Sequence, residues 1–222
     1  AIELFDIRPA TAGLLHHSIR ALFPELPSMV GHAVTMRYRS SVEYDEPPPC
    51  NDLSKHVEAL LAVPGPRVFV TEDLDNGEVG ASFGELAAST YMAFGCVGMV
   101  MSGAARDSVA VRKRKLPVFA RSQSVSHGYP QCLALNVPVE VGGLTINPGD
   151  LLHGDADGVL TIPVDRAPEI ALVCERFMAA ETEWLHYVDS GEATPEGVRD
   201  VIARYGEYQR QEREEIRRRL PR

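Results

Sequence analysis

Residues 84–121 decide the fold, and they read GELAASTYMAFGCVGMVMSGAARDSVAVRKRKLPVFAR. Small and apolar residues recur at helical spacing from Leu86 to Phe94, and Gly95 ends that segment, which predicts a short helix. The unbroken apolar run from Cys96 to Met101 is typical of a strand that is buried on both faces. We expect the chain to turn at residues 102–105 and to continue into a second helix and another strand.

The turn delivers a cation beside a carboxylate, Arg106 and Asp107, near the start of the second helix. The first N–H groups of a helix lack intrahelical partners and lie at the positive end of its dipole, so they can bind a small carboxylate. Arg106 could hold the same carboxylate bidentately, and Asp107 could hold a hard divalent ion. The alternative is a surface ion pair that caps the helix beginning near Ser108.

Several motifs in this stretch and around it resemble those of the RraA-like family. The family pattern is roughly G-E/D-L, then G-x-x-G-x-V-x-D-G-x-x-R-D, then P-V-F-A-R. The corresponding segments here are residues 84–86, 95–107 and 117–121, with further matches at residues 30–35, 136–139, 142–150 and 155–159. The family includes class II 4-hydroxy-4-methyl-2-oxoglutarate/4-carboxy-4-hydroxy-2-oxoadipate aldolases and the regulator of ribonuclease E activity. The resemblance covers Met29 to Glu183 and is specific for the family.

The resemblance implies an α/β fold of the swivelling β/β/α type, in which a central mixed sheet is flanked by helices. It implies an RraA-like catalytic domain over residues 1–190 and a C-terminal helical extension over residues 191–222. Because the family's active site lies between subunits, we expect a ring-shaped homotrimer or a pair of trimers. Relatives use a carboxylate from the adjacent subunit's C-terminal helix, and Glu181 or Glu183 is the candidate here.

By resemblance, the protein is expected to be a class II pyruvate aldolase that depends on Mg²⁺, Mn²⁺ or another divalent metal. It would cleave a 4-hydroxy-2-oxo acid of the 4-hydroxy-4-methyl-2-oxoglutarate type to pyruvate, and it would decarboxylate oxaloacetate as a side activity. The competing expectation is a non-catalytic regulator of ribonuclease E, because such RraA proteins share the fold and the Arg-Asp motif and act by protein contact.

The resemblance also implies a role for each of three side chains. Arg106 holds the substrate, Asp107 anchors the metal largely through water, and Glu85 positions water on the metal. The substrate carboxylate is bound at the start of the first helix, beside Gly84, by the three backbone N–H groups of Glu85, Leu86 and Ala87.

One departure from the family pattern concerns the Asp-Gly that precedes the Arg-Asp pair, which is Ser102-Gly103 in this chain. We expect the loss of that carboxylate to alter the choice of substrate or the hydrogen bonding at the end of the strand. The metal site does not depend on it in any evident way.

The lysines argue against a Schiff-base mechanism, which needs an amine activated by burial or by a neighbouring charge. The chain has three lysines, of which Lys113 and Lys115 lie in a solvated basic turn and Lys55 lies on a surface helix. A metal-assisted reaction is therefore favoured.

Composition limits the partners and the setting. The formal net charge of −9 at pH 7 argues against a nucleic-acid surface. We expect no membrane span and no signal peptide, because neither pattern occurs in the sequence. The four cysteines are scattered, which suits reduced thiols in a cytoplasm. The expected partners are a small 2-oxo acid and further copies of the chain.

The rest of the chain carries clear helix and strand patterns. We expect helices at residues 11–23, 52–61, 166–187 and 194–219, and strands at residues 30–38, 67–71, 137–141, 144–146 and 159–162. A two-glycine turn, Gly142-Gly143, makes residues 137–146 a hairpin.

Two groups of possible metal ligands are better explained without a metal. The carboxylates of Asp150, Asp155 and Asp157 lack EF-hand spacing and suit Asx-type turns. Three further side chains fit no zinc pattern and suit buried or loop positions: His127, Cys132 and His153.

Overall fold

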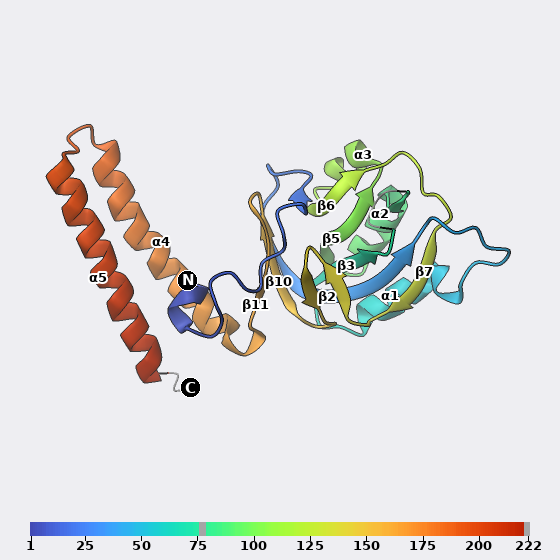
Figure 1. Ribbon diagram of the computed structural model, residues 1–222, viewed down its shortest axis with the longest axis horizontal. Helices are drawn as coiled ribbons and strands as arrows, with labels where there is room; N and C mark the ends of the chain where they lie inside the picture. The colour runs from blue at the N-terminus through green and yellow to red at the C-terminus, as the bar shows by residue number, and fades with distance from the viewer. Residues whose placement is uncertain (76–78, 220–222) are drawn as a thin grey trace. The chain divides into compact units, whose positions relative to one another are not determined.

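The computed structural model describes residues 1–75 and 79–219. The chain forms two compact units, one of Gly13–Ile162 and one of Ala1–Ala12 together with Pro163–Arg222 (Figure 1). The boundary expected from the sequence, between residues 190 and 191, lies inside the second unit. The helices on its two sides pack on each other, so the structural division differs from the expected one.

The first unit is built on a mixed sheet with the strand order β1-β6-β5-β3-β2-β10-β11, while β4 pairs with β5 and β7 pairs with β2. The strands are β1 (Arg20–Ala21), β2 (Met29–Arg39), β3 (Arg67–Asp73), β4 (Ala81–Phe83), β5 (Cys96–Ala105), β6 (Val118–Gln123), β7 (Gln131–Leu135), β10 (Leu151–Asp155) and β11 (Gly158–Ile162). The neighbours from β2 to β6 run parallel, and the outer pairs run antiparallel.

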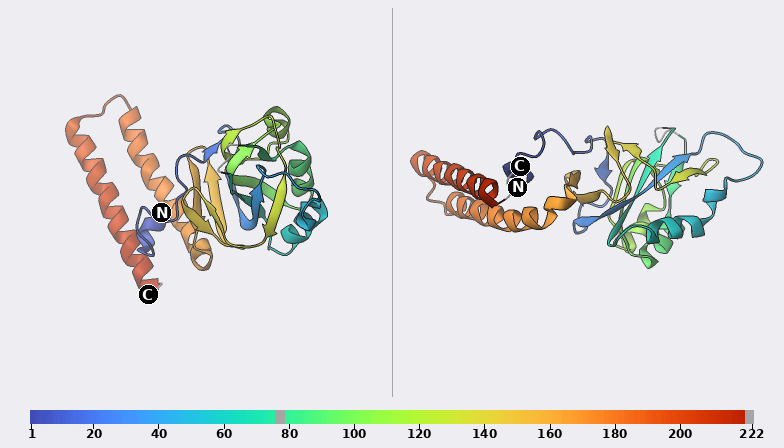
Figure 2. Two further views of the ribbon diagram at one scale, coloured as in Figure 1. Left: turned by 45° about the vertical axis from the view of Figure 1, so that its right-hand side comes forward. Right: turned by 90° about the horizontal axis from the view of Figure 1, so that it is seen from below.

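Three helices connect the parallel strands, namely α1 (Leu53–Leu61), α2 (Glu85–Ala93) and α3 (Ser108–Lys113). Figure 2 shows α1 and α2 on one face of the sheet. Asp52 caps α1 by accepting a hydrogen bond from the Ser54 N–H, as its sequence predicts. The arrangement confirms the predicted α/β fold with a central mixed sheet flanked by helices.

The sheet separates two hydrophobic cores, and alternate residues of one strand supply them. On β3, Phe69 belongs to the core under the helices, while its neighbours Val68 and Val70 belong to the core on the opposite face. That second core is covered by a hairpin of β8 (Val139–Val141) and β9 (Leu144–Ile146), which confirms the expected two-glycine turn.

A buried polar contact ties α1 to α2 in the first core. The Nδ1 atom of His56 lies 2.5 Å from the Tyr91 hydroxyl, and its Nε2 atom lies 2.7 Å from the Cys50 carbonyl oxygen. The carbonyl can only accept, so Nε2 donates to it and Nδ1 accepts from Tyr91. The Tyr91 ring stacks on Phe69 with ring centroids 4.4 Å apart, which fixes α2 on the sheet.

The second unit contains two long antiparallel helices, α4 (Ala167–Asp189) and α5 (Pro195–Arg219), as expected (Figures 1 and 2). The Arg176 guanidinium donates to both carboxylate oxygens of Glu212, at 2.9 and 2.7 Å. A small core of Leu4, Val173 and Ile216 holds the 3₁₀-helix Ile2–Phe5 against them. Among the described residues, no helix combines the length and the apolar character needed to cross a membrane.

The helix expected at residues 11–23 is wrong. Gly13 has a positive φ of 75°, and the backbone N–H groups of Leu15 and His16 donate to Val159 and Gly142 rather than along a helix. The segment ends in β1, which pairs with β6. Its backbone groups are thus satisfied by distant strands, and the local apolar spacing is overridden.

The turn expected at residues 102–105 is also wrong, because β5 continues to Ala105. The last residues of β5 pair with both β4 and β6, and the register to β6 shifts between Met101 and Ala104. The chain turns instead at Asp107, whose φ of 56° lies in the left-handed region.

Candidate functional site

The site is organised around the N-terminus of α2, where Gly84 is the N-cap residue. The backbone N–H groups of Leu86 and Ala87 have no hydrogen-bond partner in the part of the chain that the structure describes. A Cβ atom on Gly84 would lie 2.6 Å from Asp107 Oδ2 and 3.0 Å from Arg106 Nε. Glycine therefore lets the backbone pass close to both side chains without displacing them.

The Asp107 carboxylate reaches back to this helix terminus. Its Oδ2 atom accepts a hydrogen bond from the Glu85 backbone N–H at 3.0 Å and lies 3.8 Å from Arg106 Nε. The side chain of Asp107 makes no capping bond to α3, the helix that begins at Ser108. The alternative interpretation, in which Arg106 and Asp107 form an ion pair that caps α3, is therefore wrong for the Asp107 carboxylate. The bond also occupies the Glu85 N–H, which leaves two of the three expected N–H groups for a substrate.

Arg106 is fixed through its backbone and leaves its guanidinium at a pocket. Its N–H donates to the Phe83 carbonyl at 2.9 Å, at the end of β4. The side chain lines a pocket of about 280 Å³ together with Phe83, Gly84, Leu86 and His127, among others. Apart from the long contact to Asp107, no partner for this guanidinium is found within the described residues, so it can bind an anion.

Tyr38 supports the wall of this pocket from inside the sheet. Its hydroxyl donates to the carbonyl oxygens of Ala81 and His127, at 3.2 and 3.3 Å, and both acceptors belong to residues that line the pocket. Burial, followed by the nearby Asp73 charge, raises the pKa of Tyr38. The hydroxyl therefore keeps its proton and remains a donor.

Glu85 faces a second and larger cleft, of about 830 Å³, which Asp107, Lys113 and Arg114 also line. Arg114 donates to Glu85 Oε1 from Nε at 3.2 Å and from Nη2 at 2.9 Å. Sequence reasoning missed Arg114 and Lys113 as cleft residues, because their local pattern is that of a solvated basic turn. Only the packing of α2 beside α3 brings them to Glu85.

The donor set can be compared with what a divalent metal requires. No group of three or more His, Cys, Asp or Glu side chains suitable for a metal occurs among the described residues. Glu85 and Asp107 nevertheless place two carboxylates in one open cleft. Mg²⁺ usually keeps several waters and takes one or two protein carboxylates plus substrate oxygens. The residues therefore fit a largely hydrated Mg²⁺ ion and do not form a closed metal cage.

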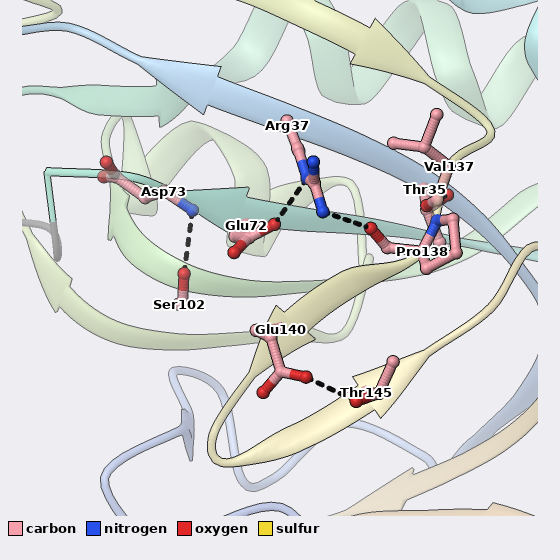
Figure 3. Close-up of polar contacts among 9 residues, drawn as sticks. All are labelled: Thr35, Arg37, Glu72, Asp73, Ser102, Val137, Pro138, Glu140 and Thr145. Atoms are coloured by element: carbon pink, nitrogen blue, oxygen red, sulfur yellow. Dashed lines mark hydrogen bonds and ion pairs between the residues drawn. The ribbon is translucent and has the colours of Figure 1, made fainter.

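The departure at Ser102 is explained by its surroundings (Figure 3). The Ser102 hydroxyl oxygen accepts the backbone N–H of Asp73 at 2.8 Å, and Ser102 is buried. A Cβ atom on the neighbouring Gly103 would lie 2.2 Å from Asp73 Oδ2, so the two strands touch at this point. The Ser102 hydroxyl therefore supplies the hydrogen-bond acceptor at this strand end without the family's carboxylate.

The same close-up shows how β2 is held at this end of the sheet (Figure 3). Arg37 donates to Glu72 Oε2 and to the Pro138 carbonyl, each at 3.0 Å, and Thr35 donates to the Val137 carbonyl at 2.5 Å. These bonds attach the hairpin of β8 and β9 to the central strands.

The remaining candidates have other partners. Glu181 accepts a hydrogen bond from the Tyr205 hydroxyl at 3.0 Å, and Glu183 lies 3.5 Å from Arg204 Nη2, so both contact α5. Their role toward an adjacent subunit stays a prediction. Asp155 accepts the backbone N–H of Asp157, two residues further on, which confirms an Asx-type turn there, whereas Asp150 accepts the N–H of Asn147, three residues before it.

Comparison with known proteins identifies the family. The family model described as Aldolase/RraA, RraA-like, matches residues 3–161. The chain therefore belongs to the RraA-like family, as its motifs indicate. The fold is also that of solved RraA structures: Streptomyces coelicolor RraAS2, an unusual member of the RNase ES inhibitor RraA protein family, superposes with a TM-score of 0.63 at 22% identity, over 82% of this chain and 87% of that chain.

Similar curated proteins differ in length and in name. DlpA of Legionella pneumophila is 34% identical over 111 residues, which cover 49% of this chain and 18% of DlpA. A Halalkalibacterium halodurans protein, provisionally named 4-hydroxy-4-methyl-2-oxoglutarate aldolase, is 37% identical over 36% of this chain and 39% of that protein. A Shewanella oneidensis protein of the same provisional name is 26% identical over 71% of this chain and 88% of that protein. The chain thus spans less than two thirds of the first two relatives.

Proposed function

We propose that the protein is a metal-dependent pyruvate aldolase that cleaves a 4-hydroxy-2-oxo acid, of the 4-hydroxy-4-methyl-2-oxoglutarate type, to pyruvate. Decarboxylation of oxaloacetate is its side activity, and Mg²⁺ or Mn²⁺ is its cofactor. The observation that carries the proposal is the convergence of Arg106, Asp107 and Glu85 on the N-terminus of α2. The provisional aldolase names of the Halalkalibacterium and Shewanella relatives support it as well.

Each group has a task in this reaction. Arg106 and the N–H groups of Leu86 and Ala87 bind the carboxylate of the 2-oxo acid. Asp107 and Glu85 would hold the divalent cation, which would supply the positive charge that stabilises the developing enolate. Glu85 also orients water in the cleft, and this water takes the proton of the C4 hydroxyl. The C4 hydroxyl then becomes a carbonyl, the C3–C4 bond breaks, and its electron pair passes to the 2-oxo group. C3 takes the proton back from the same water to give pyruvate, and C4 leaves as the carbonyl carbon of the second product.

Pyruvate release is the direct test of this function. Oxaloacetate and a panel of 4-hydroxy-2-oxo acids are incubated with the protein, with Mg²⁺ present or with the metal removed by chelation. We expect pyruvate from oxaloacetate and from at least one hydroxy acid, and loss of both activities on chelation. Pyruvate formation that is unchanged by chelation, or absent throughout, would reject the proposal.

The second candidate is a non-catalytic regulator that binds ribonuclease E. The specific observation in its favour is the structural likeness to RraAS2, whose family is named for inhibition of RNase ES. This candidate requires no convergence of Arg106, Asp107 and Glu85 at the N-terminus of α2. It predicts inhibition of a ribonuclease E-type nuclease by the wild-type protein and equally by an Asp107→Asn variant.

We also propose that the protein assembles as a ring-shaped homotrimer or as a pair of trimers, in the cytoplasm. The family resemblance supports this assembly, in which Glu181 or Glu183 of an adjacent subunit would add a carboxylate to the site. Small 2-oxo acids would then be its partners, without nucleic acid or membrane.

A further inference from the structure

The contact between Arg114 and Glu85 uses only one carboxylate oxygen. Both donors of Arg114, Nε and Nη2, point to Oε1 of Glu85. The other oxygen, Oε2, has no hydrogen-bond partner among the described residues. Asp107 is similar, because Oδ2 takes the Glu85 N–H and Oδ1 has no such partner in the same part of the chain. The cleft is therefore lined by two carboxylates, each with one oxygen still available.

The exposure of the pair argues against a role in stability. The side chains of Arg114 and Glu85 are 44% and 41% exposed. Ion pairs with such exposure contribute little to folding stability, because water screens the two charges. The geometry of the contact is thus more informative than its strength.

Besides Arg114, a second cation lies near Glu85, namely Arg106, so the Glu85 side chain has two possible ion-pair partners. Gly84, the residue before it, lies so close to Arg106 that a Cβ there would be 3.0 Å from Arg106 Nε. If Glu85 paired with Arg106, it would neutralise the guanidinium that the substrate carboxylate needs. Arg114 instead holds Glu85 in the cleft that Asp107 lines, while Arg106 lines the other pocket.

We propose that Arg114 is a positioning residue, which directs Glu85 Oε2 into the cleft beside Asp107 and so builds a two-carboxylate face for a hydrated divalent cation. The inference rests on the proposed function, since it assigns a residue to the metal side of that site. It gives the end of α3 a part in the site through Arg114, the C-cap residue that follows the helix.

Binding of Mn²⁺ to the substrate-free protein tests this role, measured by calorimetry or by electron paramagnetic resonance. Removing the cation in Arg114→Met makes the cleft more negative, so electrostatics alone predicts tighter Mn²⁺ binding. If Arg114 positions Glu85, the variant should instead bind Mn²⁺ about 10-fold more weakly, because the Glu85 carboxylate is no longer held in the cleft. Arg114→Lys keeps the charge but cannot donate two hydrogen bonds from a planar guanidinium. We therefore expect its Mn²⁺ affinity to lie between those of the wild type and Arg114→Met.

Arg112→Met is the matched control, because Arg112 is an exposed arginine only two residues before Arg114 but pairs with Glu25 at 2.6 Å. We expect its Mn²⁺ affinity and kinetics to equal those of the wild type. For Arg114→Met we expect a higher Mg²⁺ concentration at half-maximal oxaloacetate decarboxylation, with an unchanged melting temperature. Wild-type or tighter Mn²⁺ binding by Arg114→Met would overturn the positioning role and leave the proposed function standing. A wild-type protein that neither binds Mn²⁺ nor releases pyruvate would overturn both.

Discussion

Oδ2 of Asp107 lies 3.0 Å from the backbone nitrogen of Glu85 and accepts its N–H, so the residue that precedes α3 caps α2. A carboxylate at the positive end of a helix is stabilised by about 0.3–1 kcal/mol. The bond also fixes the spacing between the acidic and the cationic parts of the site, since Arg106 directly precedes Asp107 in the chain. The hydrogen bond between Asp107 and Glu85 thereby holds the start of α3 against the start of α2.

Gly84→Ala tests this alignment. The added Cβ would lie 2.6 Å from Asp107 Oδ2, which forces the carboxylate away from the Glu85 N–H. We expect Mn²⁺ binding to weaken about 10-fold, with a loss of pyruvate formation of similar size. Gly206→Ala in α5, where nothing lies within 4 Å of the added atom, is the control and should bind normally. Normal binding by Gly84→Ala would contradict the described geometry.

Arg106→Lys should mainly raise KM for oxaloacetate and leave kcat nearly unchanged. Lysine keeps the positive charge but loses the planar fork that holds a carboxylate, in the ground state and in the transition state alike. Steady-state kinetics at saturating Mg²⁺ measures this, and extra Mg²⁺ should not restore KM. A lower melting temperature with normal kinetics would instead mean that Arg106 is a purely structural residue.

Asp107→Asn should shift the metal dependence. Asparagine tolerates the left-handed backbone conformation and can still accept the Glu85 N–H, so the fold should be kept. Loss of the charge should raise the Mg²⁺ concentration for half-maximal activity about 10–100-fold, and excess Mg²⁺ should restore part of the rate. The proposed metal role of Asp107 is rejected if the Mg²⁺ titration curves of variant and wild type coincide.

His56 should make stability depend on pH. Burial lowers its pKa from 6.5, so the folded state binds fewer protons at this site than the unfolded state. Its contribution is then fully present above pH 6.5 and is lost as the pH falls through the lowered pKa of the folded state. Between about pH 5 and 7.5, a range that includes the ordinary histidine pKa of about 6.5, the melting temperature should change less with pH in His56→Gln than in the wild type. The control is His17→Gln, at an exposed site.

The assembly should be visible by light scattering. We expect the mass of three or six chains at working concentration, and Glu181→Gln or Glu183→Gln should preserve that mass while one of them lowers activity. A monomer at the concentration of the activity assay would remove the basis for a shared site and for both glutamates.

Local sequence patterns were sufficient to predict a helix or turn wherever neighbouring residues stabilise it. The apolar spacing of α2, the capped start of α1 and the glycine turn after Val141 are all readable from a few neighbouring residues. The failures have distant causes. Arg20 pairs with Ala120, and Leu15 donates to Val159, so no local window at residues 11–23 contains the partners that prevent a helix.

The residues of the candidate site likewise fall into those that the local sequence predicts and those that it does not. Arg106 and Asp107 are adjacent in sequence and were predictable from their motif, and the structure brings Glu85 to them. Arg114 was not predictable, because its partner Glu85 lies 29 residues away on another helix. Its charged neighbours made it resemble an ordinary solvated turn, and only the packing of the two helices distinguishes it from Arg112.

The left-handed backbone at Asp107 has a consequence for how the family can diverge. Few residue types accept that conformation at low cost, chiefly glycine, asparagine and aspartate. A lineage that abandons the charge at this position can therefore keep the fold only through a narrow set of replacements. Asparagine and glycine codons are each a single nucleotide away from those of aspartate. A chain of this kind can thus lose the carboxylate charge proposed to hold the metal in one mutational step, without passing through a misfolded form.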